Sequence, residues 1–231
     1  MKKKPTVIAL LPMKGNSERV PNKNLKNFNK KPLYSIIADT LLSSKYIDEI
    51  IINTDSNKII KSVNSLYSDK IIIRNRPASI SGDFVSMNKI IKDDLDNTNG
   101  DIYIQTHATN PLLSKESINS ALQIMIESLD KKPLLFDSMF SVTKIQTRFY
   151  DIHGNAVNHN PRELERTQDL PPIFEENSCF FIFTKSSFEG SYYKRIGINP
   201  RMYEIDKIEA IDIDNIEDFI IAEAVYKSRN S

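Results

Sequence analysis

Short apolar runs and amphipathic stretches alternate along the chain. The runs Val7–Leu11, Ile47–Asn53 and Asp101–Gln105 have the length and composition of buried strands. Between them, Leu33–Leu42 and Met87–Leu95 carry apolar residues at helical spacing. Strands that alternate with helices in this way predict an α/β fold with a mostly parallel sheet and right-handed crossovers.

The same pattern continues, less regularly, through the rest of the chain. It predicts a helix capped by Ser56 that runs to about Leu66, a strand at Ile71–Ile73, a helix with Ser114 and Ser117 as possible caps, a strand at Cys179–Thr184, a last strand at Ile208–Ile213 and a closing helix capped by Asn215.

The rhythm changes at about Pro133. Leu134–Ile145 has the composition of extended structure, whereas Thr147–Pro172 is polar, lacks a period and is too long for an ordinary loop. We therefore predict one domain over residues 1–231 with an inserted arm at about 134–175. We expect this arm to pack on a second subunit and make a homodimer.

Composition narrows the functional classes. A chain of 231 residues can bury one substantial core, and a net charge of +1 offers no support for nucleic-acid binding. Its one cysteine, Cys179, excludes an intrachain disulfide and a Cys-based zinc cluster. The first apolar run is short for a signal peptide, and no window approaches the ~18 apolar residues of a membrane span. We expect a cytoplasmic protein with neither nucleic acid nor membrane as partner.

A basic, polar segment follows the first predicted strand. The stretch from Leu10 to Asn24 reads LLPMKGNSERVPNKN and spreads Lys14, Arg19 and Lys23 over turn-forming residues that leave backbone N–H groups free. Such a loop between a strand and a helix is typical of a phosphate site in open α/β sheets. It matches neither the Walker pattern nor G-x-G-x-x-G. The alternative is a solvated loop whose charges only keep it in solution.

An acidic pair stands near the C-terminus, in the segment EAIDIDNIEDF. If Ile208–Ile213 is a strand, Asp212 and Asp214 point the same way, away from the core. Paired carboxylates suit Mg²⁺, which prefers oxygen ligands and takes the rest from water and phosphate. Alternatively, Asp214 is a helix cap and Asp212 an exposed charge. A basic loop and an acidic pair together suggest nucleotidyl transfer.

These two motifs resemble a known family. The stretch LPMKGNSERVPNKN, followed by KPL at Lys31–Leu33, and the later AIDID resemble the signatures of the CMP-sialic acid synthetases (acylneuraminate cytidylyltransferases) and of their relatives that activate 3-deoxy-octulosonate. The resemblance implies a three-layer Rossmann-like nucleotidyltransferase fold with a dimerising arm. It also implies CTP as substrate, Mg²⁺ as cofactor, and transfer of CMP to an acidic sugar with release of pyrophosphate.

The resemblance implies roles for individual residues. Lys14, Lys23 and Asp214 are expected to be catalytic, and Asp212 and Asp214 to hold the metal. The nucleotide-binding set is Leu11, Met13, Lys14, Gly15, Asn16, Arg19, Lys23, Asp55, Arg76, Asp83 and Ser86. Asp55 could instead cap the next helix, and Arg76 could be an exposed turn charge.

The acceptor side departs from the family pattern. The segment QTHATNPLL resembles Q-P-T-S-P-L-R with His107 in place of a sugar-contacting glutamine, and implies that His107, Thr109 and Asn110 face the acceptor. His107 could bind the acceptor, accept a proton or be structural. In QDLPPIFEENSCFF, which resembles L-P-x-x-F-R-P-N-G, Asn177 is kept but Glu175 stands where an arginine engages the sugar carboxylate.

A carboxylate at position 175 repels an acidic acceptor. Either another cation replaces the arginine, with Arg162, Arg166 and Lys185 as candidates, or the acceptor is not a standard sialic acid. We favour a nonulosonate such as pseudaminate or legionaminate, with a phosphonate or another acid as the alternative. A sugar-1-phosphate nucleotidyltransferase and a nucleotide-binding domain without turnover are the rival functions.

Overall fold

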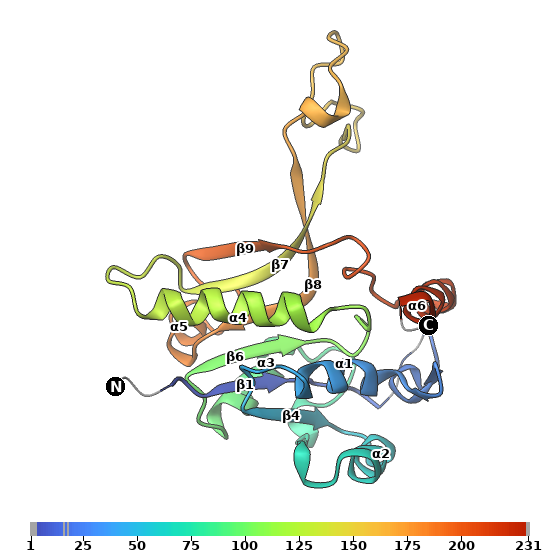
Figure 1. The fold of residues 1–231 in the computed structure, drawn as a ribbon, viewed down its shortest axis with the longest axis vertical. Helices are drawn as coiled ribbons and strands as arrows, with labels where there is room; N and C mark the ends of the chain where they lie inside the picture. Colours follow the sequence, from blue (N-terminus) through green and yellow to red (C-terminus); the bar gives the residue numbers. More distant parts are fainter. Residues whose placement is uncertain (1–3, 16, 18, 230–231) are drawn as a thin grey trace.

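A seven-stranded sheet forms the centre of the protein. The computed structural model describes residues 4–15, 17 and 19–229, and within them the strand order is β5-β4-β1-β6-β8-β7-β9 (Figure 1). The strands span Val7–Leu10 (β1), Glu49–Thr54 (β4), Ile72–Asn75 (β5), Ile102–Thr106 (β6), Ser138–Ile145 (β7), Ile173–Phe183 (β8) and Pro200–Glu204 (β9). β8 runs antiparallel to both neighbours, whereas the other neighbouring pairs are parallel. The predicted α/β fold with a mostly parallel sheet is confirmed.

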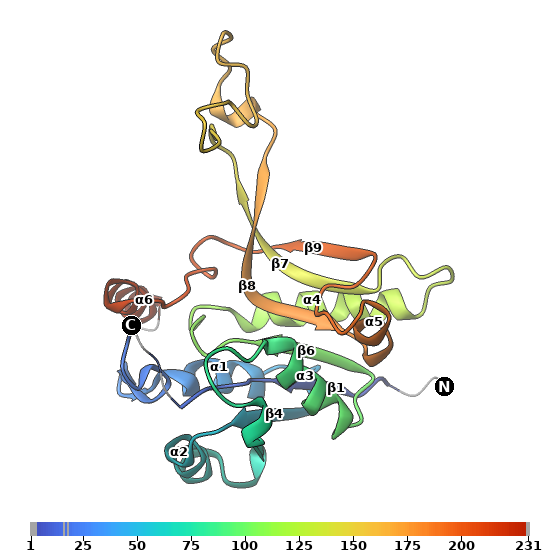
Figure 2. The ribbon, with the colours of Figure 1, turned by 180° about the vertical axis from the view of Figure 1, so that it is seen from behind.

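Helices cover both faces of this sheet and make three layers. One layer holds α1 (Leu33–Leu42), α2 (Asn57–Tyr67) and α4 (Lys115–Leu129); the other holds α3 (Met87–Asp96) and α5 (Lys185–Gly190), which come forward in Figure 2. Strand residues alternate between the layers: Ala9 packs with the first, and Ile8 and Leu10 pack with the second. In the described part of the chain, no helix has the length and apolar character needed to cross a bilayer.

Helix starts follow the predicted capping chemistry. The Ser56 hydroxyl accepts a hydrogen bond from the Ile59 N–H, and Ser114 accepts one from the N–H of Ser117, which lies inside α4. The Asn215 Oδ1 accepts from the Asp218 N–H at 2.9 Å and caps α6 (Ile216–Arg229). The Ser56, Ser114 and Asn215 caps are confirmed.

A small apolar cluster brings the C-terminal segment beside the first loop. Ile213 and Phe219 pack with Phe28 of the β2–β3 hairpin (Asn27–Phe28 and Lys31–Pro32) and with the start of α1. Single 3₁₀ turns complete the description, at Lys23–Leu25, Ser68–Lys70, Ala78–Ile80 and Thr167–Asp169. Because Ile213 is anchored in this cluster, the residue after it lies next to the 3₁₀ turn that begins at Lys23.

The predicted strand at Ile208–Ile213 is wrong. The segment turns back on itself, with the Ala210 N–H bonded to the Asp206 carbonyl, and then runs as irregular chain whose Ile213 N–H bonds to the Thr109 carbonyl. The last strand is β9, and its residues are mostly exposed because it forms an edge of the sheet. Strand alternation therefore does not orient Asp212 and Asp214.

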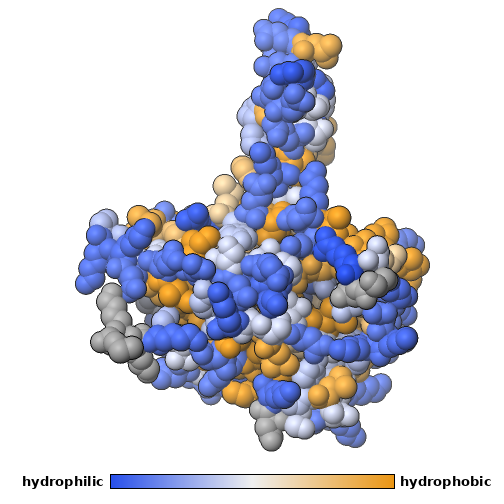
Figure 3. All heavy atoms as spheres, in the orientation of Figure 1, coloured by the Kyte–Doolittle hydropathy of each residue, from blue (hydrophilic) through white to orange (hydrophobic). Residues whose placement is uncertain are grey.

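An arm projects from the sheet (Figure 1). β7 and β8 continue their antiparallel pairing beyond the body, to Ile145 opposite Ile173, and residues 146–172 form the loops at the tip. β8 therefore begins earlier than the predicted Cys179. The visible surface of the arm is mostly hydrophilic, with apolar atoms near the tip (Figure 3). The arm lies inside the range 134–175 given above, and its contact with a second subunit stays a prediction.

Candidate active site

The loop after β1 continues along β4 at the carboxyl edge of the sheet. The Leu11 N–H bonds to the Ile51 carbonyl, and the Met13 N–H bonds to the Asn53 carbonyl. The Gly15 N–H then donates to Asp55 Oδ1 at 2.8 Å. A Cβ at Gly15 would lie 2.8 Å from the Ser56 Cβ, so this close approach requires glycine. Asp55 holds the loop, and Ser56 caps the helix in place of Asp55.

Arg76 holds the same loop in place through hydrogen bonds. Its Nε donates to Asn53 Oδ1 at 2.8 Å, and its Nη2 donates to the carbonyls of Met13 and Asn53 at 3.1 and 2.8 Å. Only 3% of its side chain is exposed, and burial lowers the pKa of the guanidinium while Asp55, 4.0 Å away, opposes that shift. The alternative reading of Arg76 as an exposed turn charge is wrong. Its guanidinium positions the loop through backbone carbonyls.

A second buried group supports Asn53. Asp94 is fully buried, and its Oδ1 accepts from Asn53 Nδ2 at 2.7 Å and from Arg74 Nε at 2.9 Å. Burial raises the pKa of the Asp94 carboxyl to about 6, although Asn53 and Arg74 act against this shift. The chain Asp94, Asn53 and Arg76 thus holds the ends of β1 and β4 in one arrangement.

Cations of the first loop meet the C-terminal carboxylates. Lys23 Nζ lies 3.9 Å from Asp214 Oδ1 and donates a hydrogen bond to the Ile213 carbonyl. Arg19 Nη2 lies 2.8 Å from the same Asp214 oxygen. Burial lowers the pKa of the Lys23 ammonium, and Asp212 and Asp214 oppose this shift. The structure therefore brings together groups that are about 190 positions apart in sequence.

Asp212 lies beside this cluster and near Thr109, in the segment that follows the strand β6. Loss of hydration raises the pKa of its carboxyl, a hydrogen bond with Thr109 opposes the shift, and the charge of Asp214 adds to it. No group of three or more His, Cys, Asp or Glu side chains in the described ranges could hold a metal ion. Two carboxylates fit an ion such as Mg²⁺, whose remaining ligands come from water and substrate phosphate.

A cavity of about 320 Å³ opens at this edge of the sheet, and we call it the loop cavity. The predicted site residues that line it are Met13, Lys14, Lys23, Arg76, Asp83, His107 and Thr109. Lys14 and Asp83 form an ion pair at 2.9 Å. A hollow of about 150 Å³, lined in part by Arg19, shares Lys14 and Lys23 with the loop cavity. The cationic part of the first loop therefore borders the space in which a nucleotide would sit.

Five of the predicted nucleotide contacts that the structure describes do not line the loop cavity: Leu11, Gly15, Arg19, Asp55 and Ser86. The Leu11 side chain is fully buried in the core. The Ser86 hydroxyl caps α3 by accepting from the Asn88 N–H at 3.3 Å, between Val85 and Met87, which do line the cavity. Asn16 lies outside the described residues.

A second cavity, of about 520 Å³, lies at the base of the arm, and we call it the arm cavity. Glu175, Glu176 and Asn177 of β8 line it together with Lys207 and Asp212. Asn177 is held on both sides of its amide, because its Nδ2 donates to Thr143 Oγ1 and its Oδ1 accepts from the Cys179 N–H. Asp212, which lines this cavity, lies near Thr109, which lines the loop cavity, so the two cavities are neighbours.

The other predicted acceptor residues divide between the cavities and the core. Thr109 and His107 line the loop cavity, whereas Asn110 is buried and its Nδ2 reaches toward the Ile211 carbonyl at 3.5 Å. The His107 Nε2 lies 3.0 Å from Gln105 Nε2, and burial beside Arg195 and Lys23 lowers the pKa of the imidazole to about 4. His107 is therefore a neutral imidazole at neutral pH.

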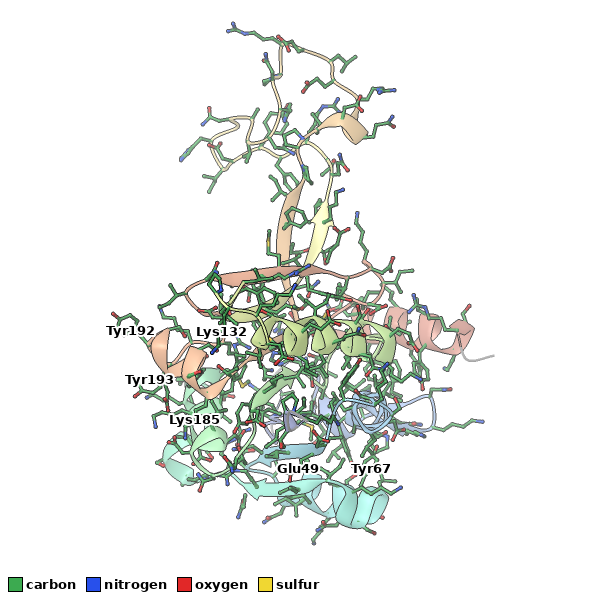
Figure 4. All side chains as sticks on the ribbon, turned by 60° about the vertical axis from the view of Figure 1, so that its left-hand side comes forward. Glu49, Tyr67, Lys132, Lys185, Tyr192 and Tyr193 are labelled. Atoms are coloured by element: carbon green, nitrogen blue, oxygen red, sulfur yellow. The ribbon has the colours of Figure 1, made fainter. Side chains whose placement is uncertain are left out.

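None of the three cations proposed to replace the missing arginine lines the arm cavity. Arg162 and Arg166 lie near the tip of the arm, where Arg166 pairs with Asp169 at 2.6 Å. Lys185 lies 3.8 Å from Asp96 at the end of α3 (Figure 4). Lys207 is the cation of this cavity, and nothing in its sequence context distinguishes it from a surface charge. Asn53 and Gln105 could have been found, because each is a polar residue at the end of an apolar strand.

The chain is similar to known proteins along most of its length. A family model described as "Cytidylyltransferase" matches residues 8–230. The chain is 25% identical to a pseudaminic acid cytidylyltransferase of Campylobacter jejuni subsp. jejuni serotype O:2, over 95% of this chain and 96% of that protein. It is 25% identical to a 3-deoxy-manno-octulosonate cytidylyltransferase of Thermodesulfovibrio yellowstonii, over 83% of this chain and 73% of that protein.

Two solved structures show the same fold. One is a CMP:2-keto-3-deoxy-manno-octonic acid synthetase complexed with CTP, with a TM-score of 0.71, 14% identity, and coverage of 97% of this chain and 99% of that one. The other is the 4-diphosphocytidyl-2C-methyl-D-erythritol synthase of Anaerococcus prevotii, with a TM-score of 0.67, 14% identity, and coverage of 97% of both chains. The three-layer nucleotidyltransferase architecture is confirmed.

Proposed function

The chain belongs to the cytidylyltransferase family, and from this membership we propose that it transfers CMP from CTP to an acidic, nonulosonate sugar and releases pyrophosphate. The observation that carries the proposal is the meeting of Lys23 with Asp214 beside the loop cavity. At this position, the cations can neutralise a bound triphosphate and the carboxylates can hold its metal ion. The similarity to a pseudaminic acid cytidylyltransferase over nearly the whole chain supports the choice of acceptor class.

In this proposal, the first loop binds the triphosphate. Lys14 and Lys23 neutralise the phosphates as charge develops on the leaving pyrophosphate, and Arg19 contributes from the adjoining hollow. Arg19 now pairs with Asp214, but their side chains are 68% and 46% exposed, and such a pair is worth only ~0–1 kcal/mol. Arg19 can therefore exchange Asp214 for a phosphate at little cost.

Asp212 and Asp214 would hold a magnesium ion. The fit rests on their donor chemistry, because two adjacent carboxylates supply the hard oxygen ligands that this ion prefers. When bound, the ion would draw electron density from the phosphate oxygens. The acceptor hydroxyl oxygen forms a bond to the α-phosphorus and gives its proton to water, while the bond between the α-phosphorus and the oxygen bridging to the β-phosphate breaks, so that CMP joins the sugar and pyrophosphate leaves.

The arm cavity is our candidate for the acceptor site, because it adjoins the loop cavity through Asp212 and Thr109. Lys207 offers a positive charge for the sugar carboxylate, whereas Glu175 and Glu176 surround the same space with negative charge. We propose that this mixture favours a nonulosonate with additional amino-derived groups over ordinary sialic acid.

We also propose that the protein is a homodimer through its arm. Side chains near the tip are apolar and exposed, with Leu164 at 97% and Ile152 at 94%. Exposed apolar groups on a projecting segment favour association. Size-exclusion chromatography with light scattering should give twice the chain mass, and deletion of residues 148–168 should give a monomer. A monomeric full-length protein would overturn this assignment.

Pyrophosphate release tests the proposed function. The purified full chain is incubated with CTP, UTP, GTP or dTTP and with pseudaminate, N-acetylneuraminate, 3-deoxy-manno-octulosonate or an aminophosphonate, with and without EDTA. We expect release with CTP and the nonulosonate, and its loss with EDTA. Preference for another nucleotide, or tight CTP binding without release in any combination, would overturn the proposal.

A further inference from the structure

Arg195 lies close enough to His107 for its charge to help lower the pKa of the imidazole. This arginine follows α5, is partly buried, and stacks on Phe181 with its Cζ 3.9 Å from the ring centroid. None of the predicted site residues includes it. Its Nη1 donates to Gln105 Oε1 at 2.7 Å. In the described part of the chain, no carboxylate forms an ion pair with Arg195 within 4.0 Å, and the group that accepts its hydrogen bond is a neutral amide. Arg195 is therefore a partly buried cation that is held by an amide and an aromatic ring and not by an ion pair.

This hydrogen bond fixes the orientation of the Gln105 amide. A guanidinium only donates hydrogen bonds, so the group that faces it must be the amide oxygen. The amide nitrogen then faces the other way, where it donates to the Thr106 carbonyl at 2.9 Å and lies 3.0 Å from His107 Nε2. The reverse orientation would place two donors against each other at Arg195. Gln105 is fully buried, so water cannot relieve such a clash.

The orientation of Gln105 in turn selects the form of His107. Because the amide nitrogen is a donor, His107 Nε2 must accept, and the imidazole proton must sit on Nδ1. The charged groups that face His107 are Arg195 and Lys23, and both are cations that disfavour the imidazolium. With Nε2 occupied, the Nδ1–H is the ring donor left for a ligand of the loop cavity that His107 lines.

We propose that Arg195 is a positioning residue: through Gln105 it locks His107 as a neutral Nδ1–H donor, which binds an oxygen of the acceptor and does not act as the base. This inference rests on the proposed function for the identity of the acceptor, and on the hydrogen bonds alone for the form of the imidazole. It settles the choice left open by the sequence, in which His107 could bind the acceptor or accept its proton.

Nitrogen NMR of the imidazole rings tests, without any substrate, whether the proton of His107 lies on Nδ1. The full chain is labelled with ¹⁵N-histidine, and long-range ¹H–¹⁵N correlations distinguish the two neutral forms. His153 and His159 on the arm serve as internal references, and the His107→Gln variant identifies the signals of His107. We expect a neutral ring with the proton on Nδ1 from pH 5.5 to 8. A wild-type ring protonated on Nε2 would overturn the proposal.

Variants of Arg195 and Gln105 should change the position of the His107 proton in different ways. Arg195→Met should release Gln105 and give a mixture of both ring forms, whereas Arg195→Lys should preserve the Nδ1–H form because an ammonium can still donate to Gln105. Gln105→Glu should move the proton to Nε2, because a carboxylate accepts.

Arg201→Met is the matched control, since Arg201 also stacks on a phenylalanine, Phe136, at 5.4 Å. If Arg195→Met fails to fold by circular dichroism, Gln105→Glu and Arg195→Lys carry the test. Identical ring signals in wild type and Gln105→Glu would overturn the proposal.

Enzyme kinetics test whether His107 binds the acceptor. Arg195→Met should raise the KM for the acceptor about tenfold, the value of one hydrogen bond, and leave the KM for CTP unchanged. Arg195→Lys should restore most of the affinity. A shifted proton with an unchanged acceptor KM would overturn the role in acceptor binding. If no acceptor supports pyrophosphate release, the proposed function fails while the NMR result still decides the form of His107.

Discussion

The loop cavity and the arm cavity differ in how firmly their side chains are held. Around the loop cavity, Arg76 is buried and bonded to backbone, and it rests on Asn53 and Asp94, which are buried as well. Around the arm cavity, Glu175 and Glu176 are exposed and stand on a hairpin that leaves the body of the protein. Residues that hold a rigid site cannot change without disturbing it, whereas exposed residues can be replaced at little cost. This contrast fits the departure from the family pattern at Glu175, which lines the arm cavity, whereas the other departure, His107, lines the loop cavity.

The largest effect should come from the carboxylate that faces the loop cations. Asp214→Ala should lower kcat by about 100-fold to 1,000-fold, the usual consequence of removing one preorganised charge partner in a transition state. The fold should survive, because the side chain is 46% exposed. Pyrophosphate release measures the effect. Glu217→Ala, which removes an exposed carboxylate of the same segment, is the control and should keep wild-type activity. Wild-type activity in Asp214→Ala would place the metal elsewhere.

Removal of Arg76 should test the rigidity of the loop cavity directly. Arg76→Met removes the Nε donor of Asn53 Oδ1 and the Nη2 donor of the Met13 carbonyl, whereas the Asn53 carbonyl keeps the Met13 N–H. Each unsatisfied buried group costs ~1–3 kcal/mol. We expect the free energy of unfolding to fall by about 3 kcal/mol. Urea denaturation measures it, and Arg166→Met on the exposed arm should change stability by less than ~1 kcal/mol. Equal losses in the two variants would remove the distinction between the two regions.

Two groups at or near the loop cavity, whose pKa values are shifted in opposite directions, should give opposite pH dependences. His107 has its pKa lowered from 6.5 to about 4, so the unfolded chain binds more protons and stability is lost as the pH falls through this window. Asp94 has its pKa raised from 3.8 to about 6, so the folded chain binds more protons and stability is gained as the pH falls. Each contribution amounts to at most about 3 kcal/mol, and the two offset each other in the wild type.

Single variants should separate these contributions. His107→Gln should become more stable relative to wild type as the pH falls from 6.5 to 4, and Asp94→Asn should become less stable over the same interval. The free energy of unfolding in urea at pH 4.5, 5.5 and 7 measures both trends. His153→Gln, on the exposed arm, should follow the wild type. Parallel curves for all four proteins would show that neither group is perturbed by burial.

The same contrast explains what the sequence could and could not predict. Apolar runs located most of the sheet and helices, because burial imposes a period on them. The run Ile208–Ile213 was misread because Ile213 is buried against α6 and not within the sheet. β9 lacks a signal because its edge position leaves most of its residues exposed.

Local motifs predicted a site at Lys23 and Asp214, and the structure brings these side chains to 3.9 Å from each other, whereas only the way the chain folds brings Arg195 to Gln105. Arg195 follows a short helix and has no neighbouring motif, so its contact with Gln105, 90 positions earlier, was not predictable.

The smallest effect should come from the arm cavity. Glu175 lies on the exposed part of β8, so its charge acts on a ligand through water and is screened by salt. Glu175→Gln should raise kcat/KM for N-acetylneuraminate by roughly threefold to tenfold at low ionic strength, and by less at high salt, with the KM for CTP unchanged. Glu163→Gln, the same change near the tip of the arm, should leave both constants at their wild-type values. Efficient turnover of N-acetylneuraminate by the wild type would show instead that Lys207 already outweighs the two glutamates. In that case, exposure of the arm cavity would account for its tolerance of Glu175 without any change in acceptor.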